Sequence, residues 1–275
     1  MNAQILLRTA ALVLALIGAS LSAVNAATKA ELDALHKALR TDEMLRIMGE
    51  EGAIEATKLQ DDMFPSRALS SWQQAVKVIY AHDDMAAAFR AGFDRELADT
   101  DVTALVDFYQ SALGTRVAEI EVEARRAIAS EEVEVAAKVA FGTLAPSRAV
   151  LVDRFIAQGD LVERNVAGAM TANLAFFQGL VEGGGFEMEE SEILAQVWEQ
   201  EDEIRADTSD WVGGYLTLAY GPLSDAELTG YIDLLDTRAG RDLNRALFAG
   251  FYDVFTRISF DLGKAASGFM MSEEL

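Results

Sequence analysis

The amino-acid sequence predicts an all-α protein, a helical bundle built from two pseudo-repeated helical-hairpin units. Only three of the 275 residues are proline (Pro65, Pro146 and Pro222), and each can stand at a helix boundary. Alanine, leucine and glutamate, all strong helix formers, dominate the chain, and no run of alternating β-branched residues lies between turn signals. We therefore expect helices over residues 29–40, 42–60, 67–96, 100–113, 116–143, 147–182, 188–219, 224–238 and 241–265.

The first 26 residues have the three parts of a secretory signal peptide. Arg8 is the only charged side chain before Lys29, an apolar run spans Ala10–Ile17, and small residues lead up to Ala26. We expect cleavage between Ala26 and Ala27, which would place the mature chain in the periplasm. The alternative is an uncleaved anchor, but the apolar run is shorter than the ~20 residues that a membrane span needs.

Charge and composition exclude several classes of function. The formal net charge is −22, so the phosphates of nucleic acid and anionic lipid surfaces would be repelled. Cationic partners, divalent ions or simple solubility fit this charge better. The chain has no cysteine, which excludes disulfides, thiol catalysis, cysteine metal sites and a lipid-bearing cysteine. No stretch after the signal is long and apolar enough to span a membrane, so we expect no stable membrane anchor.

Local signals mark several helix ends. Thr28 with Glu31 and Ser224 with Glu227 have the spacing of capping boxes. The triplet 183–185 is Gly-Gly-Gly and predicts a break near the middle of the chain. Gly114 and Gly240 each follow an apolar helical stripe, where we expect a left-handed C-terminal cap.

An internal repeat divides the chain. A shift of 126 residues without a gap aligns 72–114 with 198–240 and gives eight identities. Core-facing stripes at helical spacing recur in both segments. The pattern predicts a duplication, with a first repeat at 27–146 and a second at 147–275, packed as one globular unit or two. The alternative is that two acidic amphipathic helices simply look alike. The identical pairs are Trp72 and Trp198, Gln74 and Gln200, Asp84 and Asp210, Leu97 and Leu223, Asp99 and Asp225, Thr103 and Thr229, Asp107 and Asp233, and Gly114 and Gly240.

Residues 108–116 read Phe-Tyr-Gln-Ser-Ala-Leu-Gly-Thr-Arg. This segment resembles the signature of a bacterial exported family, domain-of-unknown-function family 2059, whose members read Phe-Tyr-x-Ser-Pro-x-Gly-x-Lys. Phe108, Tyr109, Ser111 and Gly114 match, whereas Ala112 replaces the usual proline. The resemblance covers residues 85–125 strongly and 210–250 weakly, where only Gly240 is retained. It implies an exported α-helical protein and brings no activity and no functional residues.

The sequence shows no constellation of catalytic residues. His82 stands beside Asp83 and Asp84, but neighbouring residues on a helix point in different directions, so a surface or boundary histidine is favoured. The zinc motif His-Glu-x-x-His, the Gly-x-Ser-x-Gly elbow and the phosphate-binding loop are absent. Ten acids lie between Glu187 and Asp210 without the spacing of a calcium loop, and a solvated helix face explains them best. We expect no catalytic residue, no cofactor and no metal.

The aromatic pairs of the repeat offer a weaker indication. Trp72 and Trp198 most simply serve as equivalent core anchors, although they could line an apolar pocket between the two halves. Asp84 and Asp210 could cap a helix or pair with an arginine across the interface.

The sequence therefore leaves two functions of different classes. The first is a non-catalytic periplasmic module that binds an envelope protein or an apolar ligand. The second is a hydrolase with carboxylate- or metal-assisted chemistry, which would require a cleft where acids from different helices converge. A purely structural role, with the two halves packing on each other, is the third possibility.

Overall fold

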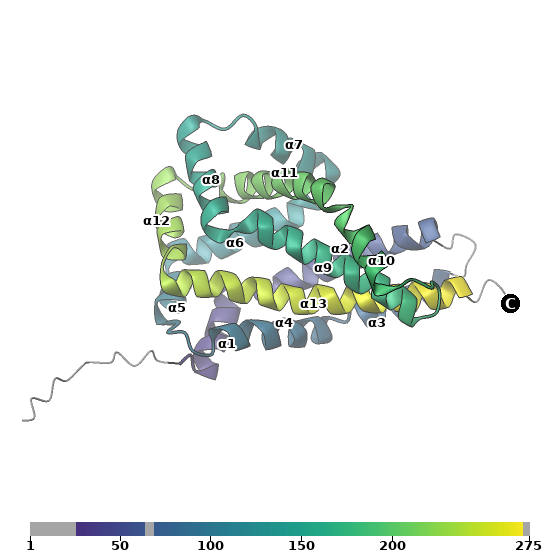
Figure 1. Ribbon diagram of the computed structural model, residues 1–275. Helices are drawn as coiled ribbons and strands as arrows, with labels where there is room; N and C mark the ends of the chain where they lie inside the picture. Colours follow the sequence, from purple (N-terminus) through teal and green to yellow (C-terminus); the bar gives the residue numbers. More distant parts are fainter. Residues whose placement is uncertain (1–25, 64–68, 272–275) are drawn as a thin grey trace, which may run out of the picture.

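The computed structural model describes residues 26–63 and 69–271, and these residues form helices and no strands (Figure 1). The predicted all-α fold is confirmed. The expected signal peptide lies outside the described residues, except for its last residue, Ala26. The helices are α1 (Lys29–Ala38), α2 (Thr41–Met63), α3 (Leu69–Ile79), α4 (His82–Leu97), α5 (Thr103–Gln110), α6 (Ala112–Ile128), α7 (Glu131–Phe141), α8 (Pro146–Gly159), α9 (Leu161–Glu182), α10 (Glu190–Trp198), α11 (Glu201–Tyr220), α12 (Asp225–Leu235) and α13 (Arg238–Met271).

Several predicted helix boundaries are confirmed. Thr28 and Glu31 form a capping box at the start of α1, and Ser224 and Glu227 form one at the start of α12. Pro146 is the first residue of α8, where its missing N–H leaves no helical bond unmade. The glycine triplet separates α9 from α10.

Four of the expected long helices are each broken into two. The breaks fall at residues 80–81, 129–130, 160 and 199–200. Asp160 adopts a left-handed backbone with φ 51°, while Ala81 and Ser130 turn the chain through extended backbone. None of the four breaks contains glycine or proline, and only the break at 160 has a glycine beside it, at 159, so local composition barely marks them. In the opposite sense, α13 extends beyond the expected 241–265 at both ends.

The expected role of Gly114 and Gly240 as left-handed C-terminal caps is wrong. Gly114 lies in the first turn of α6 and Gly240 in the first turn of α13, and neither has a positive φ. A Cβ on Gly114 would lie 2.0 Å from the carbonyl oxygen of Phe108, and one on Gly240 would lie 2.3 Å from that of Leu234. These glycines allow a helix to start tightly against the end of the preceding helix.

The longest helix, α13, runs through the middle of the molecule, with α4 along one side and α9 along another (Figure 1). Its contact with α9 is close because glycines face each other. A Cβ on Gly179 would meet the carbonyl oxygen of Phe260 at 2.1 Å, and one on Gly263 would meet that of Phe176 at 2.1 Å. The buried core is continuous and draws residues from both halves of the chain.

Helices α1–α6 and α8–α13 make the same kinds of contact in the same order. The first helix packs on the fifth in each set, α1 on α5 and α8 on α12. The second helix contacts the third, fourth and sixth, so that α2 corresponds to α9. The last helix of each set packs on the fourth helix of the other set: α13 packs on α4, and α6 packs on α11.

Polar contacts also join the two sets, from the start of the last helix of one set to the turn between the fourth and fifth helices of the other. Arg116, near the start of α6, donates to the carbonyl oxygen of Pro222 and to Glu227 at the turn between α11 and α12. Asp242 is 126 residues further on, near the start of α13. It accepts a hydrogen bond of 3.1 Å from Thr100 at the turn between α4 and α5.

Among the described residues, no single helix is both long and apolar enough to cross a membrane. Only α7 and α8 taken together reach the required length and composition, and they bend by 111° at the break between them.

Candidate binding pocket and polar clusters

A pocket of about 380 Å³ opens between α2, α3 and the start of α4. Its walls are mainly apolar, and its polar side chains come from all three helices. Such a pocket, apolar with a few polar groups, is the usual form of a small-molecule site. The lining residues are Leu45, Arg46, Gly49, Glu50, Ala53, Thr57, Gln73, Val76, Lys77, Tyr80, His82 and Met85.

Two glycines of α2 shape this pocket. A Cβ on Gly52 would lie 2.3 Å from the Tyr80 ring, and one on Gly49 would lie 3.2 Å from the sulfur of Met85. The missing side chains thus let Tyr80 and Met85 lie directly against α2. Burial raises the pKa of Tyr80 to about 12, so this phenol stays neutral and can donate a hydrogen bond.

The pocket has a charged rim. His82 is partly exposed, as expected of a boundary histidine, and its Nε2 lies 2.8 Å from Oδ1 of Asp42. Arg46 donates to the other oxygen of Asp42 at 2.9 Å. The hydrogen bond from His82 is the main reason that the pKa of Asp42 is lowered. Lys77 is exposed and makes no ion pair with any described residue.

The two tryptophans of the repeat lie in different environments. Trp72 is buried, donates to the carbonyl oxygen of Ala56 at 2.7 Å and meets the Phe269 ring edge-on. Trp198 is 60% exposed. The expectation that they are equivalent core anchors is therefore wrong. Trp72 lies inside α3, whereas the helix break in the second half comes earlier and leaves Trp198 as the last residue of α10.

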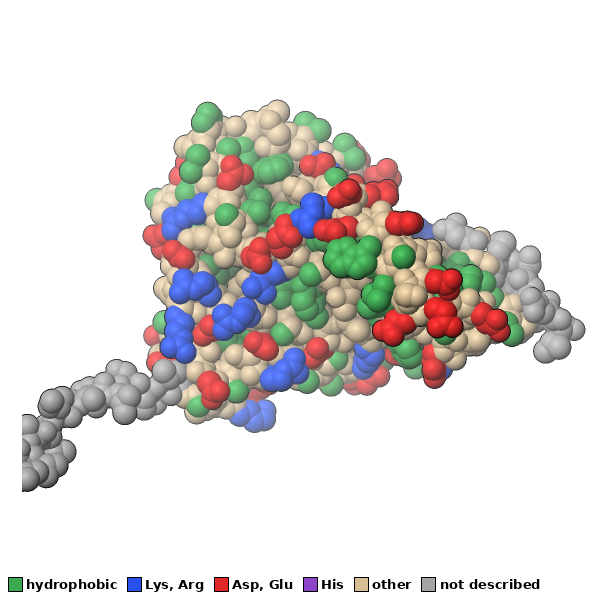
Figure 2. All heavy atoms as spheres, viewed as in Figure 1, with side chains coloured by type: hydrophobic (Ala, Val, Ile, Leu, Met, Phe, Trp, Pro, Cys, Tyr) green, Lys and Arg blue, Asp and Glu red, His purple; other side chains and the backbone are tan. Residues whose placement is uncertain are grey.

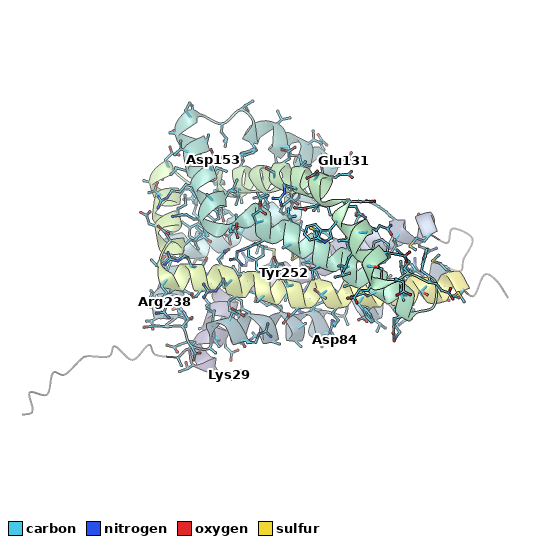
Figure 3. The ribbon with its side chains drawn as sticks, viewed as in Figure 1. Lys29, Asp84, Glu131, Asp153, Arg238 and Tyr252 are labelled. Carbon is cyan, nitrogen blue, oxygen red and sulfur yellow. The ribbon has the colours of Figure 1, made fainter. Side chains whose placement is uncertain are left out.

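Asp84 and Asp210 lie apart from any arginine that could pair with them among the described residues. Both are exposed, and neither makes a hydrogen bond or an ion pair there (Figure 3 labels Asp84). The expected pairing with an arginine across the interface is thus wrong. Asp84 lies in the first turn of α4, where a carboxylate is favoured by the helix dipole, and Asp210 lies within α11.

A cluster of tyrosines gathers around one carboxylate, and only one of its members, the motif residue Tyr109, is singled out by the sequence. Tyr220 and Tyr231 both donate to Oε1 of Glu121, at 2.7 and 3.0 Å. The hydroxyls of Tyr109 and Tyr231 lie 2.9 Å apart. Since the one proton of Tyr231 goes to Glu121, Tyr109 must be the donor to Tyr231. Burial raises the pKa of Glu121, and the two phenol donors oppose that rise.

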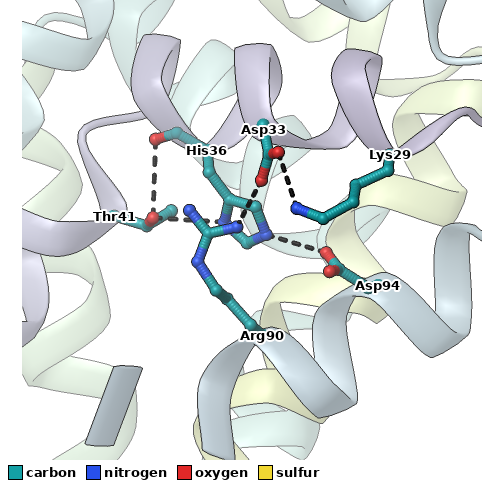
Figure 4. A network of polar contacts seen from close by, with 6 residues as sticks. All are labelled: Lys29, Asp33, His36, Thr41, Arg90 and Asp94. Atoms are coloured by element: carbon teal, nitrogen blue, oxygen red, sulfur yellow. Dashed lines mark hydrogen bonds and ion pairs between the residues drawn. The ribbon is translucent and has the colours of Figure 1, made fainter. Parts of the chain in front are cut away.

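A second polar cluster surrounds His36 where α1 meets α4 (Figure 4). The imidazole is 2% exposed, with Nε2 at 2.8 Å from Asp94 and Nδ1 at 3.2 Å from the hydroxyl of Thr41. Arg90 and Asp33 pair beside it. Burial lowers the pKa of His36, and the hydrogen bond to Asp94 opposes this. The cluster pairs α1 with α4, and no cavity opens at it among the described pockets.

The acids of the second half that the structure describes do not converge on a cleft. Those on α10 and α11 are mostly exposed, and only one carboxylate, Glu50, lines the pocket. Within the described ranges, no three histidine or acidic side chains lie close enough together to hold a metal ion. The condition for the hydrolase hypothesis is not met at this pocket.

Residues 83–140 match a bacterial family. Its description is "Uncharacterized protein conserved in bacteria (DUF2059)", and the match covers 58 of 275 residues, from α4 to α7. The match includes the segment 108–116 on which the resemblance was based. It is found once, so the second copy expected at 210–250 is not confirmed. No curated protein and no solved structure matches the chain significantly.

Proposed function

We propose that this chain is an exported, non-catalytic binding protein that holds an apolar ligand in the pocket between α2, α3 and α4. The observation that carries the proposal is the pocket itself, which has apolar walls, about 380 Å³ of space and charged groups only towards its rim. The buried clusters at Glu121 and His36 join helices and offer no comparable space. An envelope protein is the second kind of partner that the sequence favours.

Export is part of the proposal and rests on the sequence of residues 1–26. Its basic start, apolar run and small residues before Ala27 are those of a cleaved signal. We propose a periplasmic mature protein that starts at Ala27. N-terminal sequencing of the protein recovered from the periplasm tests this, and a retained Met1 would contradict it.

We also propose that the two sets of helices descend from one duplicated unit. The shift of 126 residues supports this, as does the matching order of helix contacts. The local geometry agrees: the N–H of Gly114 donates to Oγ of Ser111 at 3.1 Å, and that of Gly240 donates to Oγ1 of Thr237 at 3.0 Å.

Fluorescence titration with the uncharged apolar probe N-phenyl-1-naphthylamine tests the binding function. We expect a saturable increase in probe emission with the intact protein. Ala53→Phe places an aromatic ring in the pocket and should weaken probe binding by at least about tenfold. The milder Ala53→Leu should give a smaller loss in the same direction, and serves if the larger side chain impairs folding.

The control is Ala136→Phe, which adds the same ring to an exposed position on α7. It should bind the probe as the unaltered protein does. Native mass spectrometry of the periplasmic protein then reports whether a ligand is retained. An absence of saturable binding, or equal binding by folded Ala53→Phe and Ala136→Phe, would refute the pocket as the binding site.

A further inference from the structure

The helix α10 has apolar side chains on two neighbouring faces, one buried and one exposed. Ile193 and Val197 are buried, and α10 packs chiefly on α9. On the adjoining face, about 100° around the helix axis, Leu194, Ala195 and Trp198 are exposed at the spacing of a single helical stripe. Trp198 is 60% exposed and Leu194 38%, and Phe186, just before the helix, is 40% exposed. We refer to Phe186, Leu194, Ala195 and Trp198 as the α10 face.

The corresponding helix of the first half is covered where α10 is open. Both α3 and α10 are third in their sets and pack on the second helix, α2 or α9. However, α3 also packs against α13, whose Phe269 meets the ring of Trp72. No helix takes this place over the α10 face in the described residues. The first half thus shows that the third helix can be packed against a further helix besides the second one.

Carboxylates surround the α10 face. Figure 2 shows apolar and acidic side chains together over the α10 end of the molecule. Five exposed acids before, within and after α10 make no ion pair with a described residue, although Arg205 nearby is paired with Glu163 and Glu201. The five acids are Glu187, Glu190, Glu199, Asp202 and Glu203.

We propose that the α10 face docks a cationic amphipathic helix of a partner protein. The apolar side of that helix would cover Leu194 and Trp198, as α13 covers α3. Its lysines and arginines would lie against the five acids, and one of them could stack on the exposed ring of Trp198. A second copy of this chain, with a net charge of −22, would bring further negative charge to the same surface.

A synthetic helical peptide of lysine and leucine, labelled with a fluorophore, tests this proposal by fluorescence anisotropy. We expect it to bind the intact protein and to weaken as salt is raised. Trp198→Ala should weaken binding by at least about tenfold, as is typical of an exposed aromatic anchor. Joint replacement of Glu199, Asp202 and Glu203 by their amides should also weaken binding and reduce its dependence on salt.

Matched controls separate docking from general attraction of charge. Val139→Ala removes an apolar side chain that is 63% exposed on α7, and should leave binding unchanged. A peptide of the same composition, scrambled so that it has no apolar face, should bind at least about tenfold more weakly. Equal binding of both peptides, no effect of Trp198→Ala, or a dimer in native mass spectrometry that Trp198→Ala dissociates would overturn the proposal. Ala53→Phe should not affect this peptide, so failure here is distinguishable from failure of the pocket.

Discussion

Replacing Gly114 or Gly240 by alanine tests whether the two helix starts are built in the same way. The new Cβ would lie 2.0 Å from the oxygen of Phe108 in the first case and 2.3 Å from that of Leu234 in the second. Real Cβ atoms essentially never approach within 3.0 Å, so the helices must separate by up to about 1 Å. The atoms in the way belong to the backbone and cannot rotate aside.

The expected magnitude follows from two opposing effects. Overpacking typically destabilises a protein by about 1–3 kcal/mol. Alanine in place of glycine stabilises a helix by about 0.5–1 kcal/mol. We therefore expect a net loss of about 0–2.5 kcal/mol for each variant, against a typical unfolding free energy of about 5–15 kcal/mol.

Urea unfolding followed by far-ultraviolet circular dichroism measures this change. The control is Gly230→Ala on α12, where a Cβ meets nothing within 4 Å, so only the helix preference remains. That variant should be more stable by about 0.5–1 kcal/mol. The reasoning fails if Gly114→Ala is as stable as Gly230→Ala. A large loss at Gly114 with none at Gly240 would contradict the equivalence of the two starts.

Three further predictions follow from burial and charge. Trp72→Ala should lower the free energy of unfolding by about 3–5 kcal/mol in the same urea assay, because Trp72 is buried. Trp198→Ala should change that free energy by no more than about 0.5 kcal/mol, because Trp198 is exposed. Similar losses in the two variants would refute this difference in burial. Burial raises the pKa of Glu121 above its usual 4.5 in the folded state, so its stabilising contribution is lost as pH rises above that value. Glu121→Gln should therefore gain stability relative to the unaltered protein as pH is raised from 4.5, and a constant difference would count against this. The pKa of His36 is lowered from 6.5, so its contribution is present above that pH and is lost as pH falls; unfolding of His36→Gln should depend less on pH across this range.

The sequence predicts the helical class well because that class depends on composition and spacing along the whole chain. Capping residues such as Thr28 and Ser224 mark their helices because the cap is a contact within four residues. The break at 80–81 is different, since neither Tyr80 nor Ala81 is a known helix breaker. Tyr80 instead packs against the hydrophobic core, which is built from residues far apart in the sequence. Local patterns cannot reveal a break that tertiary contacts decide.

The same limit applies to the site residues. The identity of Trp72 and Trp198 at one offset suggests equal roles, but their exposure depends on where the chain turns after them. The tyrosine cluster brings Tyr109 and Glu121 together with residues about 100 positions away, and no periodicity relates them. The motif at 108–116 identifies Tyr109 as notable without indicating that its hydroxyl donates to Tyr231.

A single break explains why the two halves, if they are copies, present different surfaces. The chain leaves the helical path at residues 129–130, between α6 and α7, and α7 turns aside to pack on α11. The positions 126 residues later, Phe255 and Thr256, lie inside the unbroken α13. Because α13 continues, its end reaches α3 and meets Trp72 at Phe269. Because the equivalent segment in the first half has turned away, it leaves α10 uncovered, and this is where the proposed partner helix would dock.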